Sequence, residues 1–222
     1  MQTTTLGRGG PVVSRAGLGL MGMSSIYGVA DDGESIATIR AALDAGITLL
    51  DTGDFYGMGH NEMLLGRALD GVPRESVFIQ VKFGAQRDPG GGFVGFSATP
   101  AAVKTSLAYS LRRLGTDYVD LYQPARLDPD VPIEETVGAI GEMIDAGYVR
   151  YAGLSEVGAD YGLDALDAYQ LITQAVESPL ANVCDPNYTS VAKIAKDYLP
   201  AAGAMNGAHA RLSAIARSYR GS

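Results

Sequence analysis

Residues 47–57 read Ile-Thr-Leu-Leu-Asp-Thr-Gly-Asp-Phe-Tyr-Gly, and this stretch decides the fold. Its first four residues are apolar or β-branched, which predicts a buried strand that ends at Asp51. Apolar residues recur at helical spacing over 34–45, and Gly46 stands where that helix is expected to end. The next apolar run covers residues 77–82. The opening stretch therefore belongs to a strand–helix–strand series.

The same alternation of strands and helices runs from Val12 to Ser155. The expected strands cover residues 16–20, 47–51, 77–82, 119–122 and 149–154. The expected helices cover residues 34–45, 61–69, 100–114 and 133–146. Asn61 is expected to cap the second helix, and the glycines at 90–92 and 95 to form a flexible loop. This order predicts an α/β protein with a parallel sheet, either open and doubly wound or closed into a barrel.

The rhythm changes after Glu156, where the chain becomes mostly helical. Helices are expected over residues 163–176, 189–199 and 208–219, with one weak strand at 180–184. We therefore divide the chain into β/α units at 1–160 and a mainly helical segment at 161–222 that packs on the same domain. Because a (β/α) barrel needs about eight strands, we expect these helices to cover the open side of the sheet, or two copies to associate through it.

Composition excludes several classes of function. The chain has 17 Lys and Arg against 25 Asp and Glu, a net charge of −8, which argues against a nucleic-acid partner. No apolar run approaches the ~18 residues of a membrane span, and residues 1–10 do not read as a signal peptide. A cytoplasmic protein without membrane contact is expected. The lone Cys184 excludes an intrachain disulfide, and the isolated His60 and His209 give no metal-ligand spacing.

Three polar residues follow the ends of adjacent expected strands. Asp51 and Tyr56 follow the second strand, and Lys82 ends the third. Because the carboxyl ends of parallel strands share one edge, these side chains are expected to converge. An ammonium group lowers the pKa of a nearby phenol, and a carboxylate keeps the ammonium charged, so the trio suits proton donation to a carbonyl. Taken singly, a charged residue at a strand end is more often solvated or salt-bridged, and Asp54 and Arg67 read that way.

Several stretches of the chain resemble the aldo-keto reductases in order and spacing over residues 6–160. They are residues 18–23, 51–57, 61–69, 82–84, 110–118 and 153–156. The resemblance implies a (β/α)8 barrel that reduces a small aldehyde or ketone, with Tyr56 as the acid supported by Asp51 and Lys82. It also implies that NADP or NAD is the cofactor. The cofactor-binding positions that it implies are Gly22, Met23, Asp51, Ser155 and Glu156.

Two departures from the family pattern leave other functions open. The family places a catalytic histidine where this chain has Ala125. Losing one hydrogen-bond donor of this kind costs on the order of 100- to 1000-fold in rate. The family's later cofactor-binding residues find no match after Asp160. A non-catalytic binding or regulatory protein, and a truncated or altered derivative of a reductase, therefore stand beside the enzyme as alternatives.

Overall fold

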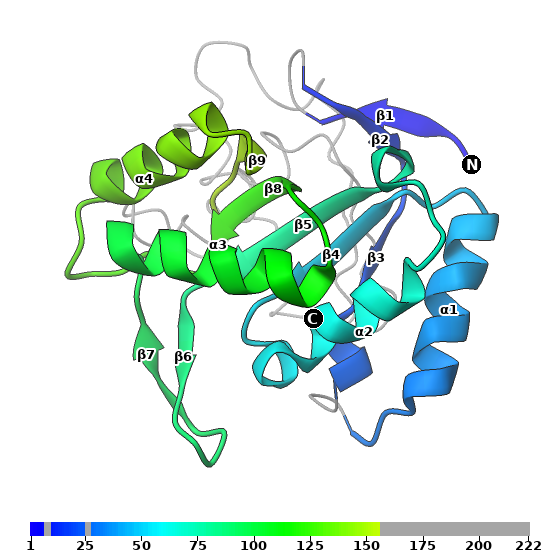
Figure 1. The fold of residues 1–222 in the computed structure, drawn as a ribbon, viewed down its shortest axis with the longest axis horizontal. Coiled ribbons are helices and arrows are strands. Elements are labelled where there is room, and N and C mark those ends of the chain that lie inside the picture. The colour runs from blue at the N-terminus through cyan, green and yellow to red at the C-terminus, as the bar shows by residue number, and fades with distance from the viewer. Residues whose placement is uncertain (7–9, 25–27, 156–222) are drawn as a thin grey trace, which may run out of the picture.

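The computed structural model describes residues 1–6, 10–24 and 28–155 (Figure 1). The helices and the weak strand expected after Glu156 lie outside the described residues, and so does the whole segment 161–222. Within the described part, the alternation of strands and helices can be followed element by element.

A five-stranded parallel sheet forms the centre of the molecule. Its strands, in spatial order, are β3 (Gly17–Gly19), β4 (Leu49–Gly53), β5 (Phe78–Phe83), β8 (Val119–Pro124) and β9 (Val149–Ala152). The helices between them are α1 (Asp32–Asp44), α2 (His60–Ala68), α3 (Pro100–Leu114) and α4 (Ile133–Asp145). The parallel strands and alternating helices expected from the sequence are therefore present, with ends shifted by a few residues.

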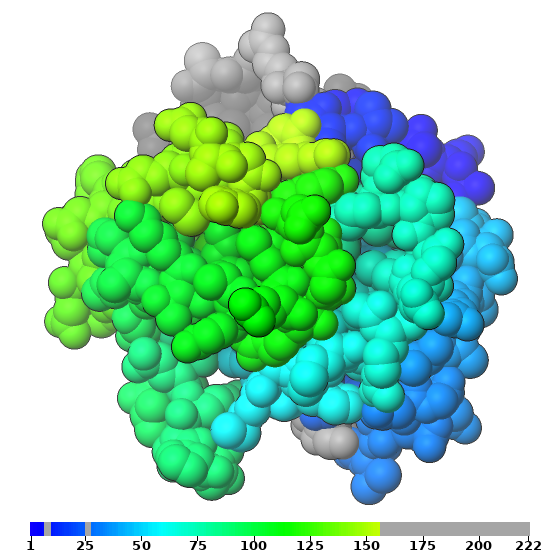
Figure 2. All heavy atoms as spheres, in the orientation of Figure 1, coloured from blue at the N-terminus to red at the C-terminus, as the bar shows by residue number. Residues whose placement is uncertain are grey.

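The four helices lie side by side over one face of the sheet (Figures 1 and 2). The main apolar core fills the space between them and the strands. Each helix and each central strand contributes to it, through residues such as Ile39, Leu50, Leu64, Ile79, Val81, Leu107 and Ile140. This packing agrees with the 3.6-residue and two-residue periods from which the helices and strands were expected.

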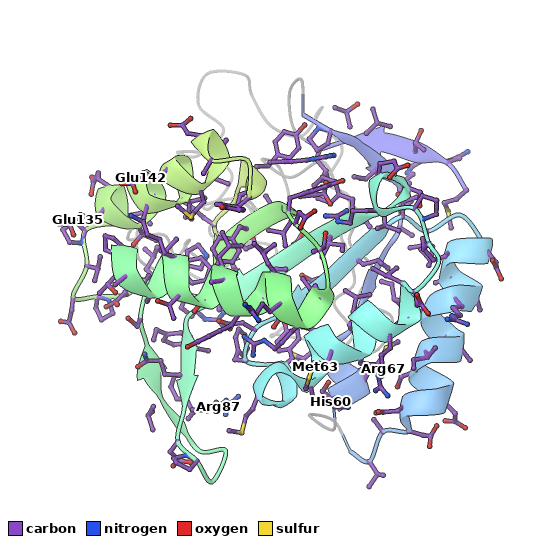
Figure 3. All side chains as sticks on the ribbon, viewed as in Figure 1. His60, Met63, Arg67, Arg87, Glu135 and Glu142 are labelled. Atoms are coloured by element: carbon purple, nitrogen blue, oxygen red, sulfur yellow. The ribbon has the colours of Figure 1, made fainter. Side chains whose placement is uncertain are left out.

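Ionic contacts also connect the first two helices. Arg67 and His60, both on α2 (Figure 3), contact the carboxylate of Asp32 in the first turn of α1. The expected salt-bridged state of Arg67 is therefore present.

An N-terminal hairpin covers the amino-terminal end of the opposite, inner face of the sheet. It consists of β1 (Thr3–Thr5) and β2 (Val12–Ser14), which pair antiparallel. The Ser14 hydroxyl accepts hydrogen bonds from the backbone of Thr48 (2.8 Å) and Leu49 (3.2 Å). Val13 packs there with Leu49 and Phe78 in a second apolar cluster. The inner face is thus apolar at its amino-terminal end.

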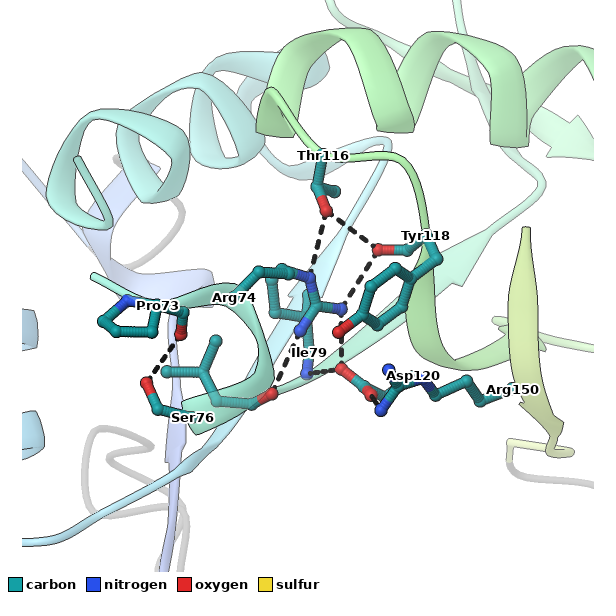
Figure 4. Close-up of polar contacts among 9 residues, drawn as sticks. Pro73, Arg74, Ser76, Ile79, Thr116, Tyr118, Asp120 and Arg150 are labelled. Carbon is teal, nitrogen blue, oxygen red and sulfur yellow. Dashed lines mark hydrogen bonds and ion pairs between the residues drawn. The ribbon is translucent and has the colours of Figure 1, made fainter. Parts of the chain in front are cut away.

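A buried ionic group fixes the same end of the sheet on the helix side (Figure 4). Asp120, 2% exposed, accepts from the Arg74 guanidinium (2.6 Å) and from the backbone N–H of Ile79 (2.9 Å). Arg74, in η3 (Arg74–Ser76), also bonds Thr116, and Arg150 approaches the other oxygen of Asp120 at 3.4 Å. Because these groups lie at the amino-terminal ends of β5 and β8, they stabilise the end of the sheet opposite the carboxyl-terminal edge, where parallel α/β proteins bind their ligands.

Two local expectations are corrected by the structure. The glycine-rich stretch is only in part a loop: residues 90–92 lie in the turn between β6 (Ala85–Arg87) and β7 (Phe93–Phe96), which pair antiparallel, whereas Gly95 lies within β7. The turn is closed because the Asp88 carboxylate accepts from the backbone N–H of Gly92 (2.8 Å). Asn61 does not cap α2, because it lies inside the helix, fully buried, and donates to the Leu20 carbonyl (2.8 Å). Its buried partners were not visible in the sequence.

Candidate active site

Asp51, Tyr56 and Lys82 meet at the carboxyl-terminal end of β4 and β5. Asp51 is the third residue of β4, and Lys82 is the fifth of β5, so both side chains point to the inner face. The Lys82 ammonium donates to both carboxylate oxygens of Asp51 and lies 3.4 Å from the Tyr56 hydroxyl oxygen. The structure thus brings together the three residues that the sequence singled out.

Tyr56 is held by a tight turn that directly follows β4. It opens η2 (Tyr56–Gly59), in which Gly57, Met58 and Gly59 all have positive φ, at 56°, 54° and 93°. A side chain at Gly59 would meet the Arg113 guanidinium, since an added Cβ would lie 2.2 Å from Arg113 Nη1. The Tyr56 ring is 4% exposed and packs edge-on against Phe55, with centroids 4.8 Å apart. The turn therefore fixes the phenol beside Lys82.

The electrostatic surroundings of Lys82 favour its charged form. Burial works against the ammonium, but the charge of Asp51, the Tyr56 phenol and their hydrogen bonds outweigh it, so the pKa of Lys82 is raised. The two charged side chains remain partly open, with 18% of Lys82 and 20% of Asp51 exposed. A positively charged group thus lies next to the phenol, at an edge where Lys82 and Asp51 remain partly exposed.

Gln80 belongs to this group although the sequence does not single it out. It precedes Lys82 by two residues on β5, so the two side chains share the inner face. Its amide nitrogen donates to Asp51 Oδ1 at 2.8 Å. The one sequence signal is a polar residue at an inward position of a buried strand.

A second cluster of ionisable side chains lies on the helix side of the sheet, between β8, α2 and α3. Glu62 is fully buried, and its carboxylate lies 2.9 Å from Arg113 Nε. Burial raises the pKa of Glu62 to about 7, against the opposing effects of the Ser110 hydroxyl and Arg113. Asp54 is half-buried, its Oδ1 has no hydrogen-bond partner among the described residues, and burial raises its pKa to about 6, so it is not simply a solvated strand-end residue. The backbone N–H of Asp54 donates to the Lys82 carbonyl (2.9 Å), which connects this cluster to the site.

Ala125 lies next to this edge, where the family pattern has a histidine. It follows β8, is 3% exposed, and its N–H donates to the Phe83 carbonyl at 2.8 Å. Its methyl group offers no hydrogen bond to a ligand. The backbone of Ala125 is therefore bonded to β5 next to Lys82, while its side chain offers no donor.

The described positions among those expected to bind the cofactor lie toward or just after the carboxyl ends of β3, β4 and β9. Gly22 and Met23 lie in η1 (Met21–Ser24), which follows β3. Ser155 follows β9 and is half-buried, whereas Glu156 lies outside the described residues. Within residues 1–6, 10–24 and 28–155, acidic, histidine and cysteine side chains form no group of three that could hold a metal ion. No helix of the described part is long and apolar enough to cross a membrane.

Comparison with known proteins identifies relatives of this chain. A family model described as the aldo/keto reductase family matches residues 15–195. A Glycine max protein named "Probable aldo-keto reductase 1" is 36% identical over 197 residues, covering 83% of this chain and 56% of that protein. The chain thus spans little more than half the length of this curated relative.

Solved structures agree with that match. A Bacillus halodurans aldo-keto reductase in its holo form is 31% identical with a TM-score of 0.66, over 82% of this chain and 56% of its own. A Gluconobacter oxydans glycerol dehydrogenase is 28% identical with a TM-score of 0.61, over 81% of this chain and 53% of its own. The expected fold class, α/β of the (β/α) barrel type, is confirmed.

Proposed function

The chain belongs to the aldo/keto reductase family, and on this basis we propose that it reduces the carbonyl group of a small aldehyde or ketone with NADPH or NADH. Tyr56 gives its hydroxyl proton to the carbonyl oxygen as the hydride reaches the carbonyl carbon, and the product is an alcohol. Asp51 and Lys82 support Tyr56 in this role.

The observation that carries the proposal is the position of the Lys82 ammonium between a carboxylate and a phenol. Its nitrogen contacts Asp51 and lies 3.4 Å from the Tyr56 hydroxyl oxygen. A phenol with its ordinary pKa of about 10 is a weak acid near neutral pH. A fixed positive charge stabilises the phenolate that remains after proton transfer, which lowers the pKa and favours the transfer. Asp51 keeps that charge in place.

The described edge of the sheet suits the nicotinamide end of such a cofactor. The Asp51 side chain keeps 20% of its surface exposed there, so the polar group can be reached by a ligand. We assign Gly22, Met23, Asp51, Ser155 and Glu156 to cofactor binding. When bound, reduced NADP or NAD would supply the hydride.

A non-catalytic binding protein is the second candidate, and Ala125 is the observation that favours it. Ala125 has no side-chain donor. Of the proposed catalytic residues, Tyr56 is therefore the one that donates a hydrogen bond to the carbonyl oxygen of the substrate. The loss of one such donor costs on the order of 100- to 1000-fold in rate. The two candidates differ in whether bound NADPH is consumed: a slow reductase consumes it with a carbonyl substrate, and a non-catalytic binding protein does not.

The test is a fluorescence titration of the purified chain with NADPH, followed by an assay of NADPH consumption with a panel of small aldehydes and ketones. Micromolar binding with turnover supports the reductase. Binding without turnover on any member of the panel favours the non-catalytic alternative. If NADPH does not bind at millimolar concentration, the chain is neither an NADPH-dependent reductase nor a non-catalytic NADPH-binding protein.

A further inference from the structure

The amide of Gln80 lies at the same level of the inner face as the Asp51 carboxylate. Gln80 and Asp51 are paired residues of the adjacent strands β5 and β4, and Lys82 is the next inward residue along β5. Gln80 is 7% exposed. Its amide nitrogen lies 2.8 Å from Asp51 Oδ1. Because a carboxylate can only accept from this amide, the contact also fixes which way the amide faces.

A buried amide at this position needs a specific reason. The preceding inward residue of β5 is Phe78, and the residue paired with Gln80 on β8 is Leu121, so an apolar side chain would suit the neighbours. A buried polar group is unfavourable unless it is hydrogen-bonded. The amide N–H of Gln80 is used on the carboxylate that holds Lys82.

We propose that Gln80 is a positioning residue that holds the Asp51 carboxylate against the Lys82 ammonium, and thereby keeps that ammonium beside the Tyr56 hydroxyl. With Gln80 in place, Asp51 receives a donor from the side and cannot turn away from Lys82 without losing it. The amide also directs its positive N–H end toward the site. Both effects favour the Tyr56 phenolate, and the role in catalysis rests on the proposed reductase function.

Among residues 1–6, 10–24 and 28–155, two sets of ionisable groups with shifted pKa values lie on opposite faces of the sheet. Lys82 interacts electrostatically with Asp51 and Tyr56. The fully buried Glu62 and the half-buried Asp54 interact with each other and with Arg113, on the helix side of the sheet. Removing the Gln80 donor should therefore act on Tyr56 through Asp51 and Lys82.

The experiment follows the ionisation of Tyr56 directly, in the full chain and without turnover. Tyrosine labelled with carbon-13 at the ring carbon bearing the hydroxyl reports each phenol by NMR, and the signal lost in Tyr56→Phe identifies Tyr56. Gln80→Met keeps the length of the side chain and removes the donor. We expect it to raise the pH midpoint of Tyr56 by about half a pH unit to one pH unit. Gln80→Leu, a second variant without a donor, should do the same and keeps the test available if the first does not fold.

Two further variants separate the donor from its packing. Gln80→His places an N–H donor at a similar reach, so its Tyr56 midpoint should stay closer to the parent than that of Gln80→Met. Gln123 is the matched control, since it is an equally buried amide, 6% exposed, and is paired with Lys82 on the neighbouring strand. Gln123→Met should leave the Tyr56 midpoint unchanged.

Each outcome decides the proposal. An unchanged Tyr56 midpoint in the variants without a donor overturns it. Equal shifts in Gln80→His and Gln80→Met, or a similar shift in Gln123→Met, overturn it too, because packing would then explain the effect. A shifted midpoint in a chain that reduces no carbonyl leaves the positioning role standing while the proposed function fails.

Discussion

Glu62→Gln should remove much of the dependence of folding stability on pH between about pH 5 and pH 8. In the folded chain, burial raises the pKa of Glu62 from its ordinary 4.5 to about 7. The folded state therefore binds this proton more tightly than the unfolded chain does. The resulting stabilisation is fully present below the unfolded pKa, and it is lost as the pH rises through about 7. Between about pH 5 and pH 8 the loss amounts to roughly 2.5 kcal/mol.

Urea unfolding at both pH values measures the effect in the parent and in Glu62→Gln. The parent should lose stability across this range, and the variant should lose roughly 2–3 kcal/mol less. Glu75→Gln, at an exposed glutamate of η3, is the control and should keep the pH dependence of the parent. If the parent and Glu62→Gln lose the same amount, the carboxyl group of Glu62 is not buried as described, and the reasoning fails.

Three other substitutions test separate parts of the account. Ala125→His should raise kcat for carbonyl reduction, by up to roughly 100-fold, if the missing donor limits the rate; steady-state assays that show no gain would mean that the site has been reorganised. Gly59→Ala should destabilise the chain by about 1–3 kcal/mol in urea, because the residue has a φ of 93° and its new Cβ would collide with Arg113; equal stability would show that the turn adapts. Lys82→Met should raise the pH midpoint of Tyr56 ionisation, measured by NMR, by one pH unit or more. An unchanged midpoint would show that the Lys82 ammonium does not stabilise the Tyr56 phenolate.

The strand ends that carry the site could be predicted because they depend on local patterns. A buried run ending at Asp51 and another ending at Lys82 indicate parallel neighbours, and parallel neighbours bring their carboxyl ends together. The turn after Tyr56, with its succession of positive φ values, was not predicted from the sequence. The convergence of the three side chains follows from this topology.

The partners of buried polar residues could not be predicted, because they depend on contacts between distant elements. Gln80 and Asp51 are 29 residues apart, and nothing local in the sequence indicates their hydrogen bond. Asp54 follows a strand end, where an aspartate is usually solvated. Its side chain instead interacts with Arg113 on the helix side of the sheet, and burial raises its pKa to about 6. Asparagine often caps a helix, but the amide of Asn61 instead donates to the Leu20 carbonyl and the Ser24 hydroxyl inside the fold.

The central claim is that Tyr56 gives the proton in carbonyl reduction, and Tyr56→Phe tests it most directly. The substitution removes the hydroxyl and keeps the buried ring that packs against Phe55. With an aldehyde that the parent reduces, kcat/KM should fall at least about 100-fold, while the affinity for NADPH and the urea midpoint stay those of the parent. Turnover equal to the parent's would show that another group supplies the proton and would contradict the account.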